Sequence, residues 1–142
     1  MSTDCVFCKI ITGELKTYKI YEDDQTIVFL DAGPVFAGHC LISPKVHYQT
    51  MMDLPHDLLA PLFSTTQLIC RAVEKGLQSG GSFVAVNNKI SQTVPHLHIH
   101  VIPRTKGDGM KGFFWPRRPY RDDEHMLEIQ QKLQAAIKEL ES

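Results

Sequence analysis

The chain has 142 residues, of which 43% are hydrophobic and 22% are charged, and its formal net charge is −1. This length suits one domain with a core of its own, and the composition is that of a globular protein. Because the charge is balanced and no apolar run has transmembrane length or the form of a signal peptide, we expect a cytoplasmic protein that binds neither nucleic acid nor membrane.

The first third of the chain predicts a helical turn followed by three strands. The turn covers residues 5–11. Residues 18–22 and 26–30 are two β-prone runs separated by three polar residues, which indicates a hairpin. Residues 39–43, HCLIS, supply a third strand after a loop rich in glycine and proline. Strands joined by short turns favour antiparallel pairing.

The rest of the chain predicts a long helix over residues 55–78, a fourth strand over 82–88 and a last helix over 122–141. Apolar residues recur at helical spacing in both helices. Residues 95–104 supply a fifth strand. We therefore expect an α+β fold, in which a long helix and a C-terminal helix accompany an antiparallel sheet of about five strands.

Three histidines alternate with apolar residues in the fifth predicted strand, PHLHIHVIPR. Strict alternation is typical of a strand, so the apolar side chains should face a core. His96, His98 and His100 should face the other side of the sheet, with neighbours roughly 6 to 7 Å apart. A half-exposed strand that carries histidines by accident is the alternative.

The histidine segment resembles the His-x-His-x-His-x-x pattern of the histidine triad (HIT) superfamily. The blocks CVFCKIITGE and FLDAGPVFAGHCLISPKVH are similar to the same family, and the likeness covers about residues 4–104. It is nearest to the Hint-like nucleotide hydrolases and transferases, including their zinc-carrying bacterial members. The resemblance implies one HIT-like domain over 1–142, with its core in 4–104 and a C-terminal extension and helix in 105–142.

The resemblance also implies an enzyme that cleaves nucleotides at the α-phosphate through a nucleotidyl-histidine intermediate. Its substrates would be purine nucleotides or dinucleotides: adenosine phosphoramidates, adenylates or dinucleoside polyphosphates. An imidazole is a competent nucleophile toward phosphorus, and His98 holds the position of the attacking ring. His100 would donate a hydrogen bond to the phosphate. A nucleotide-binding sensor or scaffold with little activity, or a metal-binding interaction module, are the competing hypotheses.

Several further residues match nucleotide-contacting positions of the family. Gln92 and Thr93 would reach the phosphate or the leaving group, and Asn87 would contact the phosphate, although a polar turn between strands explains the same residues. Asp31 would accept both ribose hydroxyls, although an aspartate at a strand end is commonly a turn residue. The wall around the base would consist of residues that composition alone assigns to the core: Val6, Phe7, Ile10 and Phe29.

The loop before the triad departs from the family pattern. Ser91 stands where the family usually has glycine, and the loop from Asn87 to Gln92 is shorter than usual. Glycine permits backbone angles that serine resists, so this loop should be remodelled. Ala32 replaces a larger apolar residue, which should widen the base pocket.

The Cys5-x-x-Cys8 pair is a redox motif, half of a metal site or a coincidence. A thioredoxin-like motif would follow a strand, and none is predicted upstream. In zinc-binding relatives the remaining ligands are a histidine at the position of His47 and the first histidine of the triad, here His96. The resemblance therefore implies a structural zinc ion held by these four residues.

Two features have no assigned catalytic role. His39, in the third predicted strand, is interpreted either as structural or as a residue that supports the side chains of the site. Residues 104–121 combine basic and aromatic side chains, which form a solvated surface or else meet a polyphosphate tail or a partner subunit. The resemblance implies a homodimer with a continuous sheet.

Overall fold

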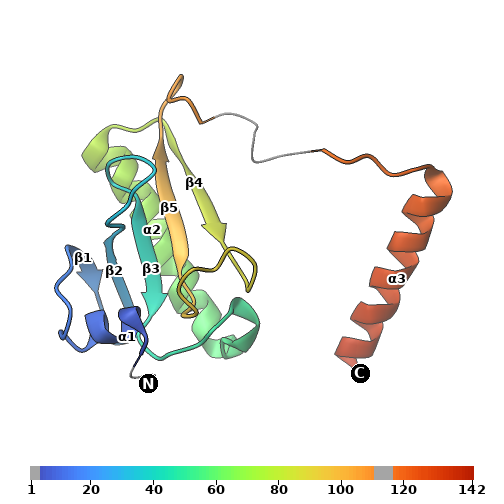
Figure 1. Ribbon diagram of the computed structural model, residues 1–142, viewed down its shortest axis with the longest axis horizontal. Coiled ribbons are helices and arrows are strands. Elements are labelled where there is room, and N and C mark those ends of the chain that lie inside the picture. The colour runs from blue at the N-terminus through green and yellow to red at the C-terminus, as the bar shows by residue number, and fades with distance from the viewer. Residues whose placement is uncertain (1–3, 111–116) are drawn as a thin grey trace. The chain divides into compact units, whose positions relative to one another are not determined.

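The computed structural model describes residues 4–110 and 117–142. It divides the chain into two compact units, Met1–Asp108 and Gly109–Ser142. The first unit holds the sheet and the long helix, and the second holds the last helix (Figure 1). The aromatic part of the basic segment, Phe113 to Trp115, lies outside the described residues, and the prediction of a single domain over 1–142 stays a prediction.

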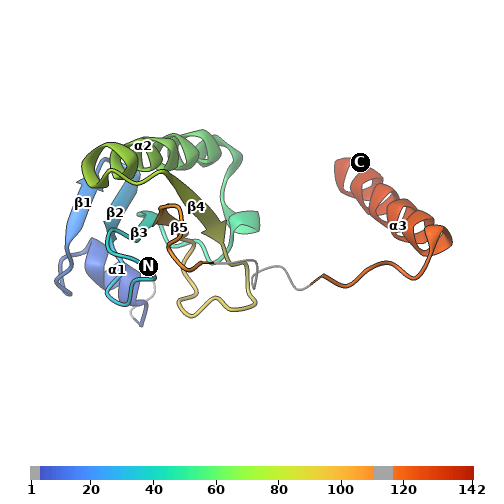
Figure 2. The same cartoon turned by 90° about the horizontal axis from the view of Figure 1, so that it is seen from above.

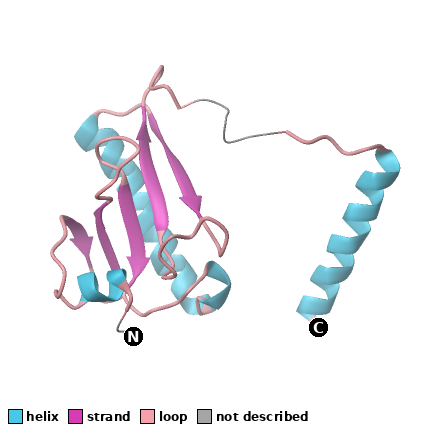
Figure 3. Cartoon of the chain, viewed as in Figure 1, coloured by secondary structure: helices cyan, strands magenta, loops and turns pink. Residues whose placement is uncertain are grey.

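The sheet has five strands in the order β1-β2-β3-β5-β4, and every neighbouring pair is antiparallel, as Figure 3 shows. This arrangement confirms the predicted fold class. The order of strands in the sheet places β5 between β3 and β4, so the histidine-bearing strand is inside the sheet and not at its edge. The strands are β1 (Lys19–Glu22), β2 (Thr26–Leu30), β3 (Cys40–Pro44), β4 (Gly81–Val86) and β5 (Ile99–Arg104).

Two helices of the first unit lie on opposite faces of this sheet (Figure 2). The short helix α1 (Val6–Ile11) lies on one face, and α2 (Leu59–Leu77) crosses the other. Two single 3-10 turns, η1 (Met51–Asp53) and η2 (His56–Leu58), precede α2, so the α-helix begins four residues later than predicted. It ends where Gln78 adopts a left-handed conformation, with φ 55°, before the glycine pair.

The apolar residues of the histidine segment face α2, as the alternation predicts. Leu97, Ile99 and Val101 are each 0% exposed and pack with Val28, Ile42 and the inner side of α2. Burying a side chain of this size contributes about 1.5–3 kcal/mol, so this contact fixes the orientation of the whole segment. A shift of one residue would turn the apolar side chains away from the core.

The histidine face is more covered than a half-exposed strand would be. His96 is fully buried and His98 is 6% exposed, because α1 and its Phe7 lie over this side of the sheet. The regular strand begins only at Ile99. Before it, the Leu97 N–H donates to the Tyr48 carbonyl and the His96 N–H donates to the Val94 carbonyl.

The second unit contains α3 (Asp123–Glu141), close to the predicted helix at 122–141. The Asp122 side chain caps it by accepting a hydrogen bond from the His125 N–H at 2.8 Å. None of its residues is buried. Within the described residues, no helix combines the length and the apolar character that crossing a membrane requires.

Candidate active site and metal centre

One hydrogen bond fixes which nitrogen of His98 can react. His98 Nδ1 lies 2.7 Å from the His96 carbonyl oxygen. A carbonyl only accepts, so Nδ1 carries the proton and Nε2 of the neutral ring keeps its lone pair. Burial lowers the pKa of His98, which favours the neutral ring.

His100 and Phe7 flank the ring of His98. The centroids of the His98 and His100 rings are 5.0 Å apart, and the Phe7 ring meets His98 edge to face at 4.9 Å. Burial, followed by the neighbouring His98 and His39, lowers the pKa of His100 to about 4. His100 is therefore neutral at physiological pH, when it offers one donor and one acceptor.

Two residues connect His100 to the end of β2. His39 Nε2 lies 2.9 Å from His100 Nδ1 and 3.6 Å from Asp31 Oδ2. Asp31 Oδ1 accepts a hydrogen bond from the Gly33 N–H at 2.8 Å, which holds the carboxylate beside the histidines. Sequence reasoning assigned His39 a structural or supporting part and no catalytic role, and did not find its partner. Its position could have indicated this bond. His39 directly precedes β3, and Leu41 of β3 pairs with His100 in β5.

The predicted base wall forms the second core cluster. Phe7 and Phe29 are buried and meet edge to face at 5.2 Å, and Ile10 packs beside them. Val6 points outward and is exposed. The aromatic pair thus lies on the same face of the sheet as His98 and His100, while Val6 is not part of the cluster.

Of the residues predicted to contact the phosphate, Gln92 is held by two hydrogen bonds, one to a neighbouring loop and one within its own loop. Gln92 Nε2 donates to the Gln49 carbonyl at 2.6 Å, and Gln92 Oε1 accepts from the Lys89 N–H at 3.0 Å. Asn87 and Thr93 are exposed. Thr93 lines a cavity of about 420 Å³ together with Asp4, Cys5, Val6, His47, Gln49, Val94 and Pro95.

Ser91 adopts a left-handed backbone conformation, which glycine accepts more readily than serine. Its φ is 61°, and Lys89 in the same loop has φ 71°. These left-handed residues turn the chain within the short loop and place strain at Ser91. The remodelling of this loop relative to the family stays a prediction.

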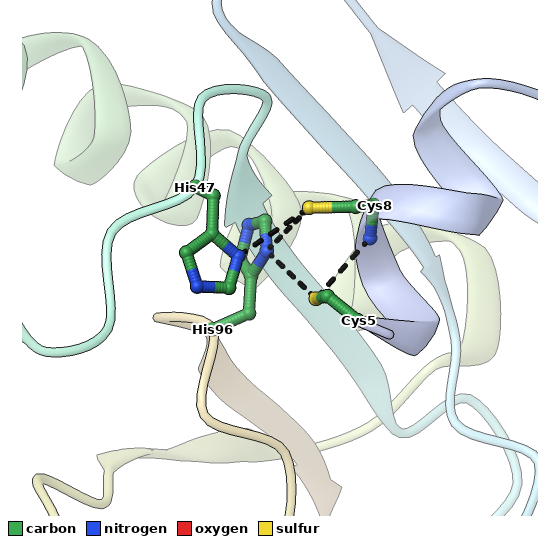
Figure 4. A group of neighbouring side chains, drawn as sticks. All are labelled: Cys5, Cys8, His47 and His96. Carbon is green, nitrogen blue, oxygen red and sulfur yellow. Dashed lines mark hydrogen bonds between the residues drawn. The ribbon is translucent and has the colours of Figure 1, made fainter. Parts of the chain in front are cut away.

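The four predicted metal ligands come together, as Figure 4 shows. Their ligand atoms all lie within 4.8 Å of one another. Cys5 Sγ is 3.3 Å from His96 Nδ1, and Cys8 Sγ is 3.6 Å from the same atom and 3.3 Å from His47 Nδ1. In a tetrahedral zinc site with ordinary bond lengths, sulfur and nitrogen ligands are about 3.5 Å apart.

The tautomer of His96 also suits a metal. Its Nε2 donates to the Pro44 carbonyl at 2.9 Å, so the neutral ring presents the lone pair of Nδ1 to the two thiols. Burial lowers the pKa of His96 to about 4, which keeps the ring unprotonated. Cys5 caps α1 and accepts the Cys8 N–H at 3.4 Å, so the first turn of the helix brings both sulfur atoms to this site.

Two curated relatives bear on the activity. The chain is 43% identical over 110 residues to adenylylsulfatase HINT3 of Arabidopsis thaliana. The matched region covers 76% of this chain but only 56% of that protein. It is 28% identical over 142 residues to adenosine 5'-monophosphoramidase HNT1 of Candida albicans, covering 97% and 94% of the two chains.

Solved structures match over nearly the whole chain. SMU.412c from Streptococcus mutans UA159 has a TM-score of 0.87 at 32% identity, covering 96% of this chain and 87% of that one. A Zn-bound histidine triad family protein from Mycobacterium smegmatis has a TM-score of 0.74 at 35% identity, covering 99% and 98%. The HIT domain family model matches residues 12–107. The chain therefore belongs to the HIT family.

Proposed function

We propose that this protein is a nucleotide hydrolase or transferase that cleaves at the α-phosphate through a nucleotidyl-His98 intermediate. The observation that carries the proposal is the 2.7 Å bond from His98 Nδ1 to the His96 carbonyl, which leaves the Nε2 lone pair available. Nε2 attacks the α-phosphorus and forms a P–N bond while the bond to the leaving group breaks. The leaving group takes up a proton from solvent, and the water that attacks in the next step returns one proton to solvent. Water then attacks the phosphorus, the P–N bond breaks, and the nucleoside monophosphate and the neutral imidazole are released.

The surrounding residues bind and orient the nucleotide. His100 donates to an α-phosphate oxygen, where negative charge increases in the transition state. Asp31 accepts the ribose hydroxyls, and Phe7, Ile10 and Phe29 contact the base. Gln92, Thr93 and Asn87 meet the phosphate and leaving group from the loop. For Gln92, this role requires that its amide exchange the Gln49 carbonyl for the ligand.

The proposed substrates are the classes in which AMP is joined to a good leaving group: phosphoramidates, adenylates such as adenylyl sulfate, and dinucleoside polyphosphates. The names of the Arabidopsis and Candida relatives support the first two classes. Because the chain spans 56% of the Arabidopsis relative, that protein's activity is a guide to the chemistry only. We further propose a cytoplasmic homodimer.

Zinc is the proposed occupant of the Cys5, Cys8, His47 and His96 cluster. Two thiolates and two neutral imidazoles form a full tetrahedral donor set, which fits a structural ion. The ion would join α1 to the segment before β5, and so hold Phe7 against His98. The Zn-bound relative from Mycobacterium smegmatis supports this assignment.

Turnover with a nucleophile variant tests the proposal. The protein is incubated with an adenosine phosphoramidate, adenylyl sulfate and diadenosine tetraphosphate, and AMP release is followed. His98→Ala should lower the rate at least about 10³-fold, while His56→Ala, at an exposed histidine, should leave it unchanged. Mass spectrometry of a reaction quenched in alkali, in which a P–N bond to imidazole survives, should show AMP bound to His98. Nucleotide binding without turnover would favour the sensor or scaffold, and full activity of His98→Ala would refute the enzyme proposed here.

A further inference from the structure

His39 is the fourth histidine of the site, and its protonation pattern can be deduced from its neighbours. It precedes β3 and is 4% exposed. The backbone N–H of Val35 points at its Nδ1 across 3.1 Å. A backbone N–H can only donate, so Nδ1 must accept. The neutral His39 ring therefore carries its proton on Nε2.

The proton on His39 Nε2 has two acceptors within reach. His100 Nδ1 is at 2.9 Å, a good hydrogen-bond distance, whereas Asp31 Oδ2 is at 3.6 Å. The main bond therefore runs from His39 to His100. Because His100 Nδ1 accepts, the neutral His100 ring must carry its own proton on Nε2. Among the described residues His100 Nε2 makes no hydrogen bond, so this N–H is available to a ligand.

A metal ion explains the same three side chains less well. By distance alone Asp31, His39 and His100 could hold one, since their ligand atoms lie within 4.8 Å of one another. Metal binding at His39 Nε2 requires a lone pair there, but the lone pair of the neutral ring is at Nδ1, where Val35 donates. His96 shows the opposite arrangement: its Nε2 donates to the Pro44 carbonyl, and the lone pair of its Nδ1 faces the thiols. The contrast favours a chain of hydrogen bonds at His39.

We propose that His39 is a positioning residue, which holds His100 in the tautomer whose Nε2–H donates to the α-phosphate of a bound nucleotide. The chain of donors runs from the Val35 amide through His39 to His100 and then to the ligand. This inference rests on the proposed function for the role of the last donor. The His39–His100 bond itself is a property of the free protein and can be tested separately.

Nitrogen NMR of the metal-loaded protein with ¹⁵N-labelled histidine tests whether His39 sets the tautomer of His100. In the wild type, His100 should show a protonated Nε2 and an unprotonated Nδ1, and His39 the same pattern. In His39→Leu, which removes the donor, His100 should become a mixture of tautomers. A proton on His100 Nδ1 in the wild type, or an unchanged His100 spectrum in folded His39→Leu, would overturn the proposal even if the protein had no enzymatic activity.

Kinetics of a conservative variant test whether the bond from His39 to His100 supports turnover. The amide of a glutamine occupies the place of Nε2 and donates, so His39→Gln should keep kcat within about 3-fold of wild type, whereas His39→Leu should lower kcat about 10- to 100-fold with little change in KM. Thr66→Val removes a buried bond away from the site, from Thr66 Oγ1 to the Leu62 carbonyl on α2, and should leave kcat near wild type. Equal loss of kcat in folded His39→Gln and His39→Leu would contradict a role as donor. If His39→Leu does not fold, the wild-type spectrum and the kcat of His39→Gln still test the proposal.

Discussion

The carbonyl oxygen of His96 accepts the Nδ1 proton of His98 at 2.7 Å, while the His96 ring faces the thiols of the candidate metal centre. One residue therefore belongs to both candidate sites. Its side chain is part of the Cys5, Cys8, His47 and His96 cluster, and its backbone selects the reactive nitrogen of the proposed nucleophile. Any change that moves the His96 backbone should alter the orientation of His98 as well.

The activity should persist below the ordinary pKa of histidine. The nucleophile must be neutral, and burial lowers the pKa of His98 below the ordinary histidine value of 6.5. As the pH falls, the rate is lost only when the pH passes through this lowered pKa, because protonation then removes the Nε2 lone pair. The profile of kcat/KM against pH should thus have an acid limb with its midpoint below 6.5, the value of an unperturbed histidine.

The exposed His56 provides a reference for this profile. His56→Ala should give the same acid limb, and circular dichroism at each pH should show that the protein stays folded. A midpoint at or above the unperturbed value would mean that burial does not control the nucleophile.

Loss of one thiol should release the metal and loosen the fold. Cys8 lies 3.3 Å from His47 and 3.6 Å from His96, so Cys8→Ser leaves the tetrahedral set incomplete. Structural metal sites contribute directly to folding free energy. A loss of about 3 kcal/mol should lower Tm by roughly 10 °C in a chain of this size. Elemental analysis should find one zinc per wild-type chain and almost none in the variant.

Cys70→Ser is the matched control, because Cys70 lies on α2 and is not part of the cluster. It should retain the metal and most of the stability. Equal zinc content in Cys8→Ser and Cys70→Ser would show that the cluster is not the metal site.

Local patterns predicted the elements of this fold, but not how the side chains of the candidate site are connected. Alternation in PHLHIHVIPR was enough to place Leu97, Ile99 and Val101 in the core, because period two has a single physical explanation in a sheet. For His39 the sequence indicated a structural or supporting part but not its partner, since the bond to His100 joins residues 61 positions apart. The attachment of Gln92 to Gln49 likewise depends on two loops that meet only in the folded chain. Tautomers follow from such contacts and carry no signature in the sequence.

Replacing Ser91 by glycine should stabilise the protein. The left-handed conformation costs a residue other than glycine about 1–2 kcal/mol of conformational energy. Ser91, with φ 61°, lies in this region. Glycine relieves that strain but adds roughly 0.5–1 kcal/mol of chain entropy to the unfolded state, so the net gain should be up to about 1 kcal/mol. Urea unfolding at equilibrium measures it.

Ser82→Gly tests the same substitution where no strain exists. Ser82 lies in β4 and pairs with Pro103, so glycine there should lower the unfolding free energy by about 0.5–1 kcal/mol. Effects of the same sign and size at Ser82 and Ser91 would show that the loop conformation is not strained.

The metal-free protein should lose stability as the pH falls below 6.5. Burial lowers the pKa values of His39 and His98 and brings those of His96 and His100 to about 4. Between the unfolded value near 6.5 and these lowered values, the unfolded chain binds protons that the native chain does not bind. The free energy of unfolding therefore rises with pH in this window, by up to about 1.4 kcal/mol per pH unit for each fully buried group, and levels off above it. Urea titrations with a chelator between pH 5 and 7.5 measure the slope. His56→Ala should not change it, whereas a free energy of unfolding that is the same at both ends of this range would contradict the neutral, buried histidine cluster.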